Sequence, residues 1–263
     1  MAENAVLTQR EKQKPEARKI LEVVHAHKRF GAVLALDDIS FHLNQGEILA
    51  LLGDNGAGKS TMIKALSGVH ELDSGKIFLE GKEVHFRTPV DARNSGIETV
   101  YQDLALFDNL TVAANLYVGR EISRFRKLGP LSFLEDRKME NNTKQFITDL
   151  QVNLPNPKSD VGLMSGGQRQ AIAVARAAVF GSSIVLLDEP TAALGARESR
   201  NVLNLVKKLP EKGVSVIIIS HNLEHVSKVA DRAVVLRRGK YIGEAVPTSE
   251  NHDLIVKMIV GSV

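Results

Sequence analysis

The chain has 263 residues, of which 43% are hydrophobic and 25% are charged, the balance of an ordinary globular protein. Its net charge of +3 forms no concentrated basic stripe, so we do not expect a nucleic-acid binder. It has no cysteine, which excludes disulfides, thiol chemistry and cysteine-based zinc sites. No apolar run approaches the ~20 residues of a membrane-spanning helix, and the N-terminus lacks the apolar stretch of a signal peptide. We therefore expect a protein that stays inside the cell.

The N-terminal part is predicted to contain a tail followed by antiparallel strands. Residues 1–19 are polar and mixed in charge, which predicts a flexible tail. Alternation of apolar and polar residues predicts strands over residues 21–24 and 39–43, in a sheet with one exposed face. A hairpin is predicted further on, around Gly81.

A glycine-rich stretch lies between an apolar strand predicted over residues 48–52 and a helix predicted over residues 62–66. It has the form G-x-x-x-x-G-K-S, the P-loop pattern, in which glycines permit a tight turn around phosphate oxygens. The following helix directs its partly positive N-terminus at the anion. Lys59 can then bridge the β- and γ-phosphates, and Ser60 can ligate Mg²⁺. The alternative, a glycine-rich turn without a ligand, is disfavoured by the flanking strand and helix. The predicted nucleotide-binding residues are Gly53, Asp54, Asn55, Gly56, Ala57, Gly58, Lys59, Ser60 and Thr61.

Two later buried strands also end in side chains that suit phosphate chemistry. Residues 184–187 lead to Asp188 and Glu189, and residues 214–219 lead to His221. Alternation of such strands with helices predicts a parallel sheet covered on both faces, and ligands collect at the carboxyl ends of its strands. Asp188 is the expected Mg²⁺ ligand, Glu189 the general base for an attacking water, and His221 a γ-phosphate contact. An acidic pair that caps a helix and a purely structural histidine are the alternatives, which the neighbouring P-loop makes weaker.

Between residues 103 and 163 strand patterns give way to helical spacing, and we predict a small helical lobe inserted into the αβ core. Helices are predicted over residues 110–116 and 142–150, with chain breaks at residues 129–130 and 154–157. The remaining predicted elements are helices over residues 171–180, 198–209 and 252–260 and strands over residues 97–101, 233–236 and 241–242.

One short motif connects these features to a family. Met164-Ser165-Gly166-Gly167-Gln168 lies ahead of the segment that carries Asp188 and Glu189. With Met in place of Leu, it is similar to the L-S-G-G-Q signature of the ATP-binding subunits of ABC transporters, which the chain resembles from about residue 20 to its C-terminus. The resemblance implies an α/β fold: a P-loop NTPase (RecA-like) core with an antiparallel β subdomain and an inserted α-helical subdomain. It also implies one ABC ATPase domain over residues 20–263.

The resemblance assigns further roles. Phe30, which the pattern leaves open between core packing and an adenine platform, becomes the aromatic side chain stacked on adenine. Gln102, which says almost nothing by itself, becomes a contact to the γ-phosphate and Mg²⁺. Residues 191–195 become the D-loop, although Gly195 stands where the family usually has an acidic residue, which puts a D-loop carboxylate role in doubt. The implied catalytic residues are Lys59, Gln102, Glu189 and His221, and the implied Mg²⁺ ligands are Ser60, Gln102 and Asp188.

Members of this family sandwich ATP between two subunits arranged head to tail. The resemblance therefore implies a homodimer in which each signature contacts the nucleotide on the partner's P-loop, through Ser165, Gly166, Gly167 and Gln168. It also implies membrane permease subunits that dock on residues 108–118, and indirectly a substrate-binding protein. The implied location is the cytoplasmic face of the inner membrane, with no nucleic-acid partner.

The sequences of the D-E-P-T-A-A-L segment and of the signature resemble those of bacterial simple-sugar importers of the ribose, xylose and fructose type, so we expect ATP-driven sugar import. An exporter is one alternative, although exporter cassettes are often fused to membrane helices. An ATPase acting on nucleic acid or ribosomes is another, but such members carry long coiled-coil insertions or a second cassette, which this sequence lacks. A GTPase would need an Asn-Lys-x-Asp motif, also lacking. A nucleotide-binding regulator with little turnover stays open because of Gly195.

Overall fold

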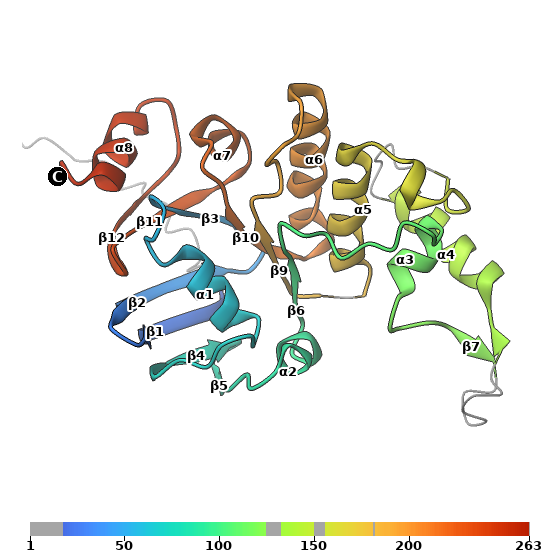
Figure 1. Cartoon of the computed structure of the whole chain (residues 1–263). Coiled ribbons are helices and arrows are strands. Elements are labelled where there is room, and N and C mark those ends of the chain that lie inside the picture. The colour runs from blue at the N-terminus through green and yellow to red at the C-terminus, as the bar shows by residue number, and fades with distance from the viewer. Residues whose placement is uncertain (1–17, 125–132, 150–155, 181, 263) are drawn as a thin grey trace, which may run out of the picture.

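The computed structural model describes residues 18–124, 133–149, 156–180 and 182–262, which form two main β-sheets flanked by helices, with a lobe at one end (Figure 1). The larger sheet has the strand order β12-β11-β3-β10-β9-β6. Its strands pair in parallel except for β12, which is antiparallel to β11. These strands are β3 (Ile48–Leu52), β6 (Ile97–Val100), β9 (Ile184–Asp188), β10 (Ser215–Ile219), β11 (Arg232–Arg237) and β12 (Lys240–Ala245).

The smaller sheet is antiparallel and has the strand order β2-β1-β4-β5. Along β2, Ile39 and Phe41 are buried while Ser40 is exposed, which confirms the predicted half-exposed sheet. The predicted hairpin around Gly81 is the β4–β5 pair. The strands are β1 (Lys19–Phe30), β2 (Val33–Asn44), β4 (Ser74–Leu79) and β5 (Lys82–Val84).

Side-chain alternation along the parallel strands separates two cores. One face of the larger sheet packs with α1 (Lys59–Leu66) against the antiparallel sheet, and α2 (Pro89–Asn94) adds Ala92 to this core. The opposite face packs against α5 (Gly166–Val179), α6 (Ala196–Lys208), α7 (Leu223–Val229) and α8 (His252–Val260). The parallel sheet is therefore covered on both faces, as predicted, and all five residues of β3 and of β10 are buried.

The lobe contains α3 (Val112–Tyr117), α4 (Asp136–Asp149), the two-residue strands β7 (Ser123–Arg124) and β8 (Phe133–Leu134), and the 3₁₀ turn η2 (Val161–Leu163). Its small core joins Val112, Leu116 and Met139 to Ile172 of α5. Because the opposite face of α5 packs against the parallel sheet, this helix connects the lobe to the sheet.

Several short elements were not predicted. These are α2, α7, the β7–β8 pair and the 3₁₀ turns η2 and η3 (Pro210–Lys212). The observed helices α3, α4, α5 and α6 match predicted ones with shifted ends, and α8 has the predicted bounds. Lys19, placed at the end of the predicted tail, is the first residue of β1. The rest of that tail through residue 17, the break at residues 129–130 and the first half of the break at residues 154–157 lie outside the described residues.

Candidate nucleotide-binding site

The loop between β3 and α1 folds tightly because its glycines adopt backbone conformations that other residues rarely adopt. Gly53 has φ +145° and Gly58 has φ +105°. A Cβ at Gly53 would lie 2.1 Å from the Leu236 carbonyl oxygen, and one at Gly58 would lie 2.6 Å from that of Ala35. The loop is therefore packed tightly against β2 and β11. It leads directly into α1, whose N-cap is Gly58.

The side chain of Lys59, the first residue of α1, reaches back to the start of this loop. Its side chain is nearly buried, and Nζ donates hydrogen bonds to the carbonyl oxygens of Gly53 at 2.8 Å and Asp54 at 3.0 Å. Burial lowers the pKa of Lys59, and the charges of Glu189, Asp54 and Asp188 partly oppose this. Its two hydrogen-bond partners in the described structure are neutral carbonyls, so the cation is well placed to receive an anion.

A cleft of about 430 Å³ opens over the P-loop at the carboxyl ends of β3, β9 and β10. Residues that follow these three strands therefore line one cleft. The cleft is lined by Phe30, Val33, Leu34, Ala35, Asn55, Gly56, Ala57, Gly58, Lys59, Ser60, Thr61, Gln102, Asp188, Glu189, Ile219 and His221. Of the predicted P-loop residues, Gly53 and Asp54 do not line this cleft. Their carbonyl oxygens accept the hydrogen bonds from Lys59.

The parallel register places the acidic pair beside the histidine. Asp188, the last residue of β9, is paired with Ile219, the last residue of β10. Burial raises the pKa of Asp188, while the nearby charges of Lys59, Lys64 and His221 lower it. This carboxylate is therefore half-buried, and the cationic groups around it favour its ionised form, the form that can ligate a metal ion.

Glu189 is held in an unusual backbone conformation, with φ +52°, a region that residues other than glycine rarely adopt. Its N–H donates to the Ile219 carbonyl at 3.0 Å, and its Oε1 lies 3.0 Å from His221 Nε2. The two atoms are close, but no described group, His221 included, meets the geometry of a hydrogen bond to Oε1. Burial raises the pKa of Glu189, and the charge and backbone N–H of His221 oppose this shift.

Phe30 lines the same cleft. It is 43% exposed, so the alternative of a buried core phenylalanine is wrong. Its ring meets His70 edge to face, with centroids 5.1 Å apart, and Lys28 Nζ lies 5.6 Å from the ring centroid. Sequence reasoning missed His70, because its contact with Phe30 joins distant segments of the chain, and Lys28, because nothing in the β1 pattern singles it out.

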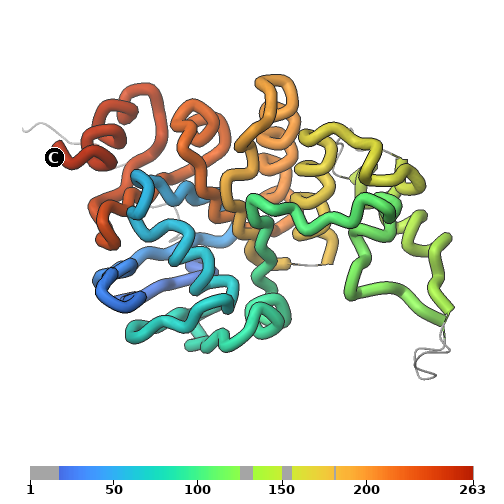
Figure 2. The backbone as a smooth tube through the Cα atoms, viewed as in Figure 1, coloured from blue at the N-terminus to red at the C-terminus, as the bar shows by residue number. Residues whose placement is uncertain are grey.

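Gln102 lies in the cleft at the point where the chain leaves β6 for the lobe, and Figure 2 shows this green segment crossing from the sheet to the lobe. Two side chains that sequence reasoning missed hold the segment. Arg176 of α5 donates to the carbonyl oxygens of Leu104 and Ala105, both at 2.8 Å. Asn115 of α3, which is fully buried, accepts a hydrogen bond from the Phe107 N–H at 2.8 Å.

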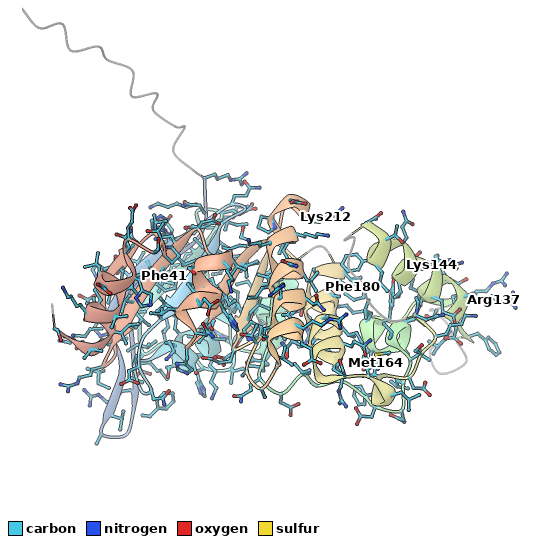
Figure 3. All side chains as sticks on the ribbon, turned by 90° about the horizontal axis from the view of Figure 1, so that it is seen from above. Phe41, Arg137, Lys144, Met164, Phe180 and Lys212 are labelled. Carbon is cyan, nitrogen blue, oxygen red and sulfur yellow. The ribbon has the colours of Figure 1, made fainter. Side chains whose placement is uncertain are left out.

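The signature residues Ser165, Gly166, Gly167 and Gln168 do not line the cleft. Ser165 is the N-cap of α5: its Oγ accepts from the Gln168 N–H at 3.3 Å, and Gln168 Oε1 accepts from the Ser165 N–H at 3.0 Å. The side chain of Gln168 is thus engaged in a capping box, a role readable from Ser and Gln three positions apart. Met164, just before the cap, lies on the lobe side of the molecule with Arg137 and Lys144 (Figure 3).

Gly167 of the signature and Gly195 both have structural roles. A Cβ at Gly167 would lie 2.6 Å from Glu198 Cβ, so only glycine allows α5 and α6 to approach this closely. Gly195, the residue that departs from the family pattern, is the N-cap of α6 and offers no side-chain cap. Instead, its own N–H donates to Glu198 Oε2 at 3.2 Å.

These residues fit an adenine nucleotide with a divalent cation. The cleft offers a partly exposed aromatic ring, a glycine-rich loop with a buried cation, and a hydroxyl with carboxylates. The buried Glu189 Oε1 without a hydrogen-bond donor marks the position of an acceptor for a bound molecule. Ser60 and Asp188 carry hard oxygen atoms of the kind that Mg²⁺ prefers. By themselves, the described His, Asp and Glu side chains form no cluster that would hold a metal ion.

Comparisons with known proteins agree with this geometry. The family model described as ABC transporter matches residues 36–192. The chain is 50% identical over 223 residues to the xylose/arabinose import ATP-binding protein XylG of Sulfolobus acidocaldarius, covering 85% of this chain and 86% of that protein. It is 50% identical to the fructose import ATP-binding protein FrcA of Rhizobium meliloti, covering 81% and 83%.

A longer relative is the ribose import ATP-binding protein RbsA of Halalkalibacterium halodurans, which is 38% identical over 92% of this chain. This chain spans about half of its length, 48%. Among solved structures, an ATP-binding cassette of an ABC transporter in its ADP conformation has a TM-score of 0.79 and 27% identity, covering 92% of this chain and 99% of that one. The fold is therefore that of an ATP-binding cassette.

Proposed function

Because this chain belongs to the ABC transporter family, we propose that it is the ATP-hydrolysing subunit of an importer, with a simple sugar as the cargo. The observation that carries the proposal is the meeting of Lys59, Asp188, Glu189 and His221 in one cleft, at the ends of three neighbouring strands. The sugar assignment is supported by the names of the relatives, which import xylose or arabinose, fructose and ribose.

In the proposed reaction the substrate ATP lies with its base on Phe30 and its phosphates on the P-loop. Lys59 and the backbone N–H groups before α1 stabilise the negative charge of the phosphates. Mg²⁺, held by Ser60 and Asp188 with Gln102 nearby, would neutralise charge on the β- and γ-phosphates.

Glu189 accepts a proton from the attacking water while the water oxygen bonds to the γ-phosphorus. The bond from that phosphorus to the bridging oxygen breaks, and its electron pair leaves with ADP. His221 lies against Glu189 and lines the same cleft, so it can hold the carboxylate in place and donate to the departing phosphate.

A second copy of this chain is proposed to complete the site. The signature residues carry N–H groups at the N-terminus of α5, which favours an anion, yet they lie outside the cleft of their own chain. A head-to-tail dimer would supply them from the partner, so that ATP joins the two copies and hydrolysis releases them. Residues 108–118 would receive permease subunits, indirectly serving a substrate-binding protein, at the cytoplasmic face of the membrane. In the part of the chain that the structure describes, no helix is long and apolar enough to span a membrane.

The test combines a hydrolysis-deficient variant with size measurement. Glu189→Gln should be a dimer by light scattering in saturating Mg·ATP and a monomer without nucleotide, while the wild type hydrolyses ATP. Lone subunits under both conditions would overturn the proposed dimer. Co-purification from membranes of the source cells should identify a permease, and sugar uptake should stop when the chain is deleted. Recovery of ribosomes or DNA in place of a permease would favour the nucleic-acid alternative.

A further inference from the structure

A second histidine lies close to the cleft without lining it. The chain after β9 and the chain after β10 run next to each other, and two side-chain pairs join them. The first pair, Glu189 and His221, belongs to the cleft. The second pair is Thr191 and His225, whose Oγ1 and Nδ1 atoms lie 3.0 Å apart. The two pairs are thus formed by residues two apart on one segment and four apart on the other.

His225 is fixed to the same turn that carries His221. Its backbone N–H donates to Asn222 Oδ1 at 3.1 Å, the side-chain cap of α7. The N–H of Asn222 in turn donates to Ser220 Oγ at 3.1 Å. A movement of the His221 backbone would therefore be resisted by a capped helix whose first turn is tied to Thr191.

Thr191 is equally well fixed on the other side. Thr191 is only 9% exposed, and the N–H of Ala192 donates to the Glu189 carbonyl at 3.0 Å. A tight turn therefore connects Thr191 to Glu189. Such a support is needed because Glu189 has φ +52° and a buried oxygen without a hydrogen-bond donor, an arrangement that surrounding contacts must maintain.

We infer that the Thr191–His225 hydrogen bond is a positioning contact for hydrolysis, which holds the Glu189 segment at a fixed separation from the His221 turn. Neither residue lines the cleft, so both act through Glu189 and His221. The inference rests on the proposed ATPase function. It predicts that loss of the pair lowers kcat, because the base is displaced, and leaves the KM for ATP unchanged, because Phe30 and the P-loop are untouched.

The test uses matched variants in steady-state ATP hydrolysis at saturating Mg²⁺. Thr191→Val removes the hydroxyl at nearly constant volume, and His225→Leu removes the ring nitrogens. Each should lower kcat by about fivefold, the effect of losing one hydrogen bond in the transition state, with KM within about twofold of wild type. Thr191→Ser retains the hydroxyl and should retain most of the activity. Ser227→Ala, which removes a hydroxyl elsewhere on α7, should have no effect.

The double variant Thr191→Val, His225→Leu should be no slower than the slower single variant, since both changes break the same contact. Thermal unfolding of each variant checks that a lower kcat does not reflect loss of folded protein. Additive effects, a Ser variant as slow as the Val variant, or a KM that rises in step with a lower kcat would each overturn the inference. If the wild type hydrolyses ATP and the variants match it, only this inference fails. A wild type without ATPase activity would overturn the proposed function as well.

Discussion

Glu189 Oε1 lies 3.0 Å from His221 Nε2, across the ends of two adjacent parallel strands. The contact brings the proposed general base next to His221, the residue predicted to contact the γ-phosphate. Burial raises the pKa of the Glu189 carboxyl group, whereas the neighbouring His221 lowers it. This is the arrangement expected of a group that must receive a proton from water.

We predict that Glu189→Gln reduces kcat for ATP hydrolysis at least about a hundredfold, the smallest contribution usual for a general base. ATP affinity should stay close to that of wild type, because the amide retains the size of the carboxylate and the P-loop is unchanged. Phosphate release and equilibrium binding of a fluorescent ATP analogue measure the two quantities. Turnover at the wild-type rate would remove Glu189 from the role of base.

Much of the site could be predicted because it follows from local rules. The P-loop spacing predicts a strand, a turn and a helix, and buried apolar runs predict β9 and β10 as buried parallel strands. Once the strands are parallel, Asp188, Glu189 and His221 must meet at one edge. Short elements such as α2 and α7 escaped prediction because six or seven residues give too little periodicity.

The contacts that support the site could not be predicted in the same way. Arg176, His70 and His225 each contact a residue that lies 34 to 72 positions away in the chain, so their partners depend on the tertiary structure. Gln168 shows a different limit, because a family motif suggested nucleotide binding while the local Ser–Gln spacing already described a helix cap. Both roles are compatible, since the N–H groups of the capped helix remain at its end.

We predict that Phe30→Ala weakens ATP binding about tenfold, since stacking of a base on an aromatic ring contributes ~1–3 kcal/mol. Because the ring is 43% exposed, the free energy of unfolding should fall by only about 1 kcal/mol or less. Isothermal titration of ATP and urea unfolding check the two effects, with Phe30→Tyr as the control that keeps the ring. Unchanged ATP affinity in the alanine variant would contradict the adenine platform.

We predict that Gly167→Ala destabilises the isolated chain by ~1–3 kcal/mol, because the new methyl group would lie 2.6 Å from Glu198 Cβ between α5 and α6. Gly166→Ala is the matched control: its methyl group would meet only Leu194, at an ordinary 3.5 Å. Urea unfolding without nucleotide separates this packing effect from any role in ATP binding. Equal stability of the two variants would show that the two helices separate at little cost.

Arg232 joins the two main sheets. Its guanidinium donates to Glu47 Oε1 at 2.8 Å, to Glu244 Oε2 at 2.6 Å and to the His42 carbonyl at 2.7 Å. Arg232→Met should lower the free energy of unfolding by ~3–5 kcal/mol, because the nearly buried Glu47 carboxylate loses its cation.

Adding Glu47→Leu to that variant should restore part of the loss, since an uncompensated buried charge is then removed. Glu244→Gln breaks only the more exposed arm of the network and should cost about 1 kcal/mol or less. Urea unfolding at pH 7 measures all four proteins. If Arg232→Met is no less stable than Glu244→Gln, the packing between the two sheets carries their association, and the buried ion pair contributes little to it.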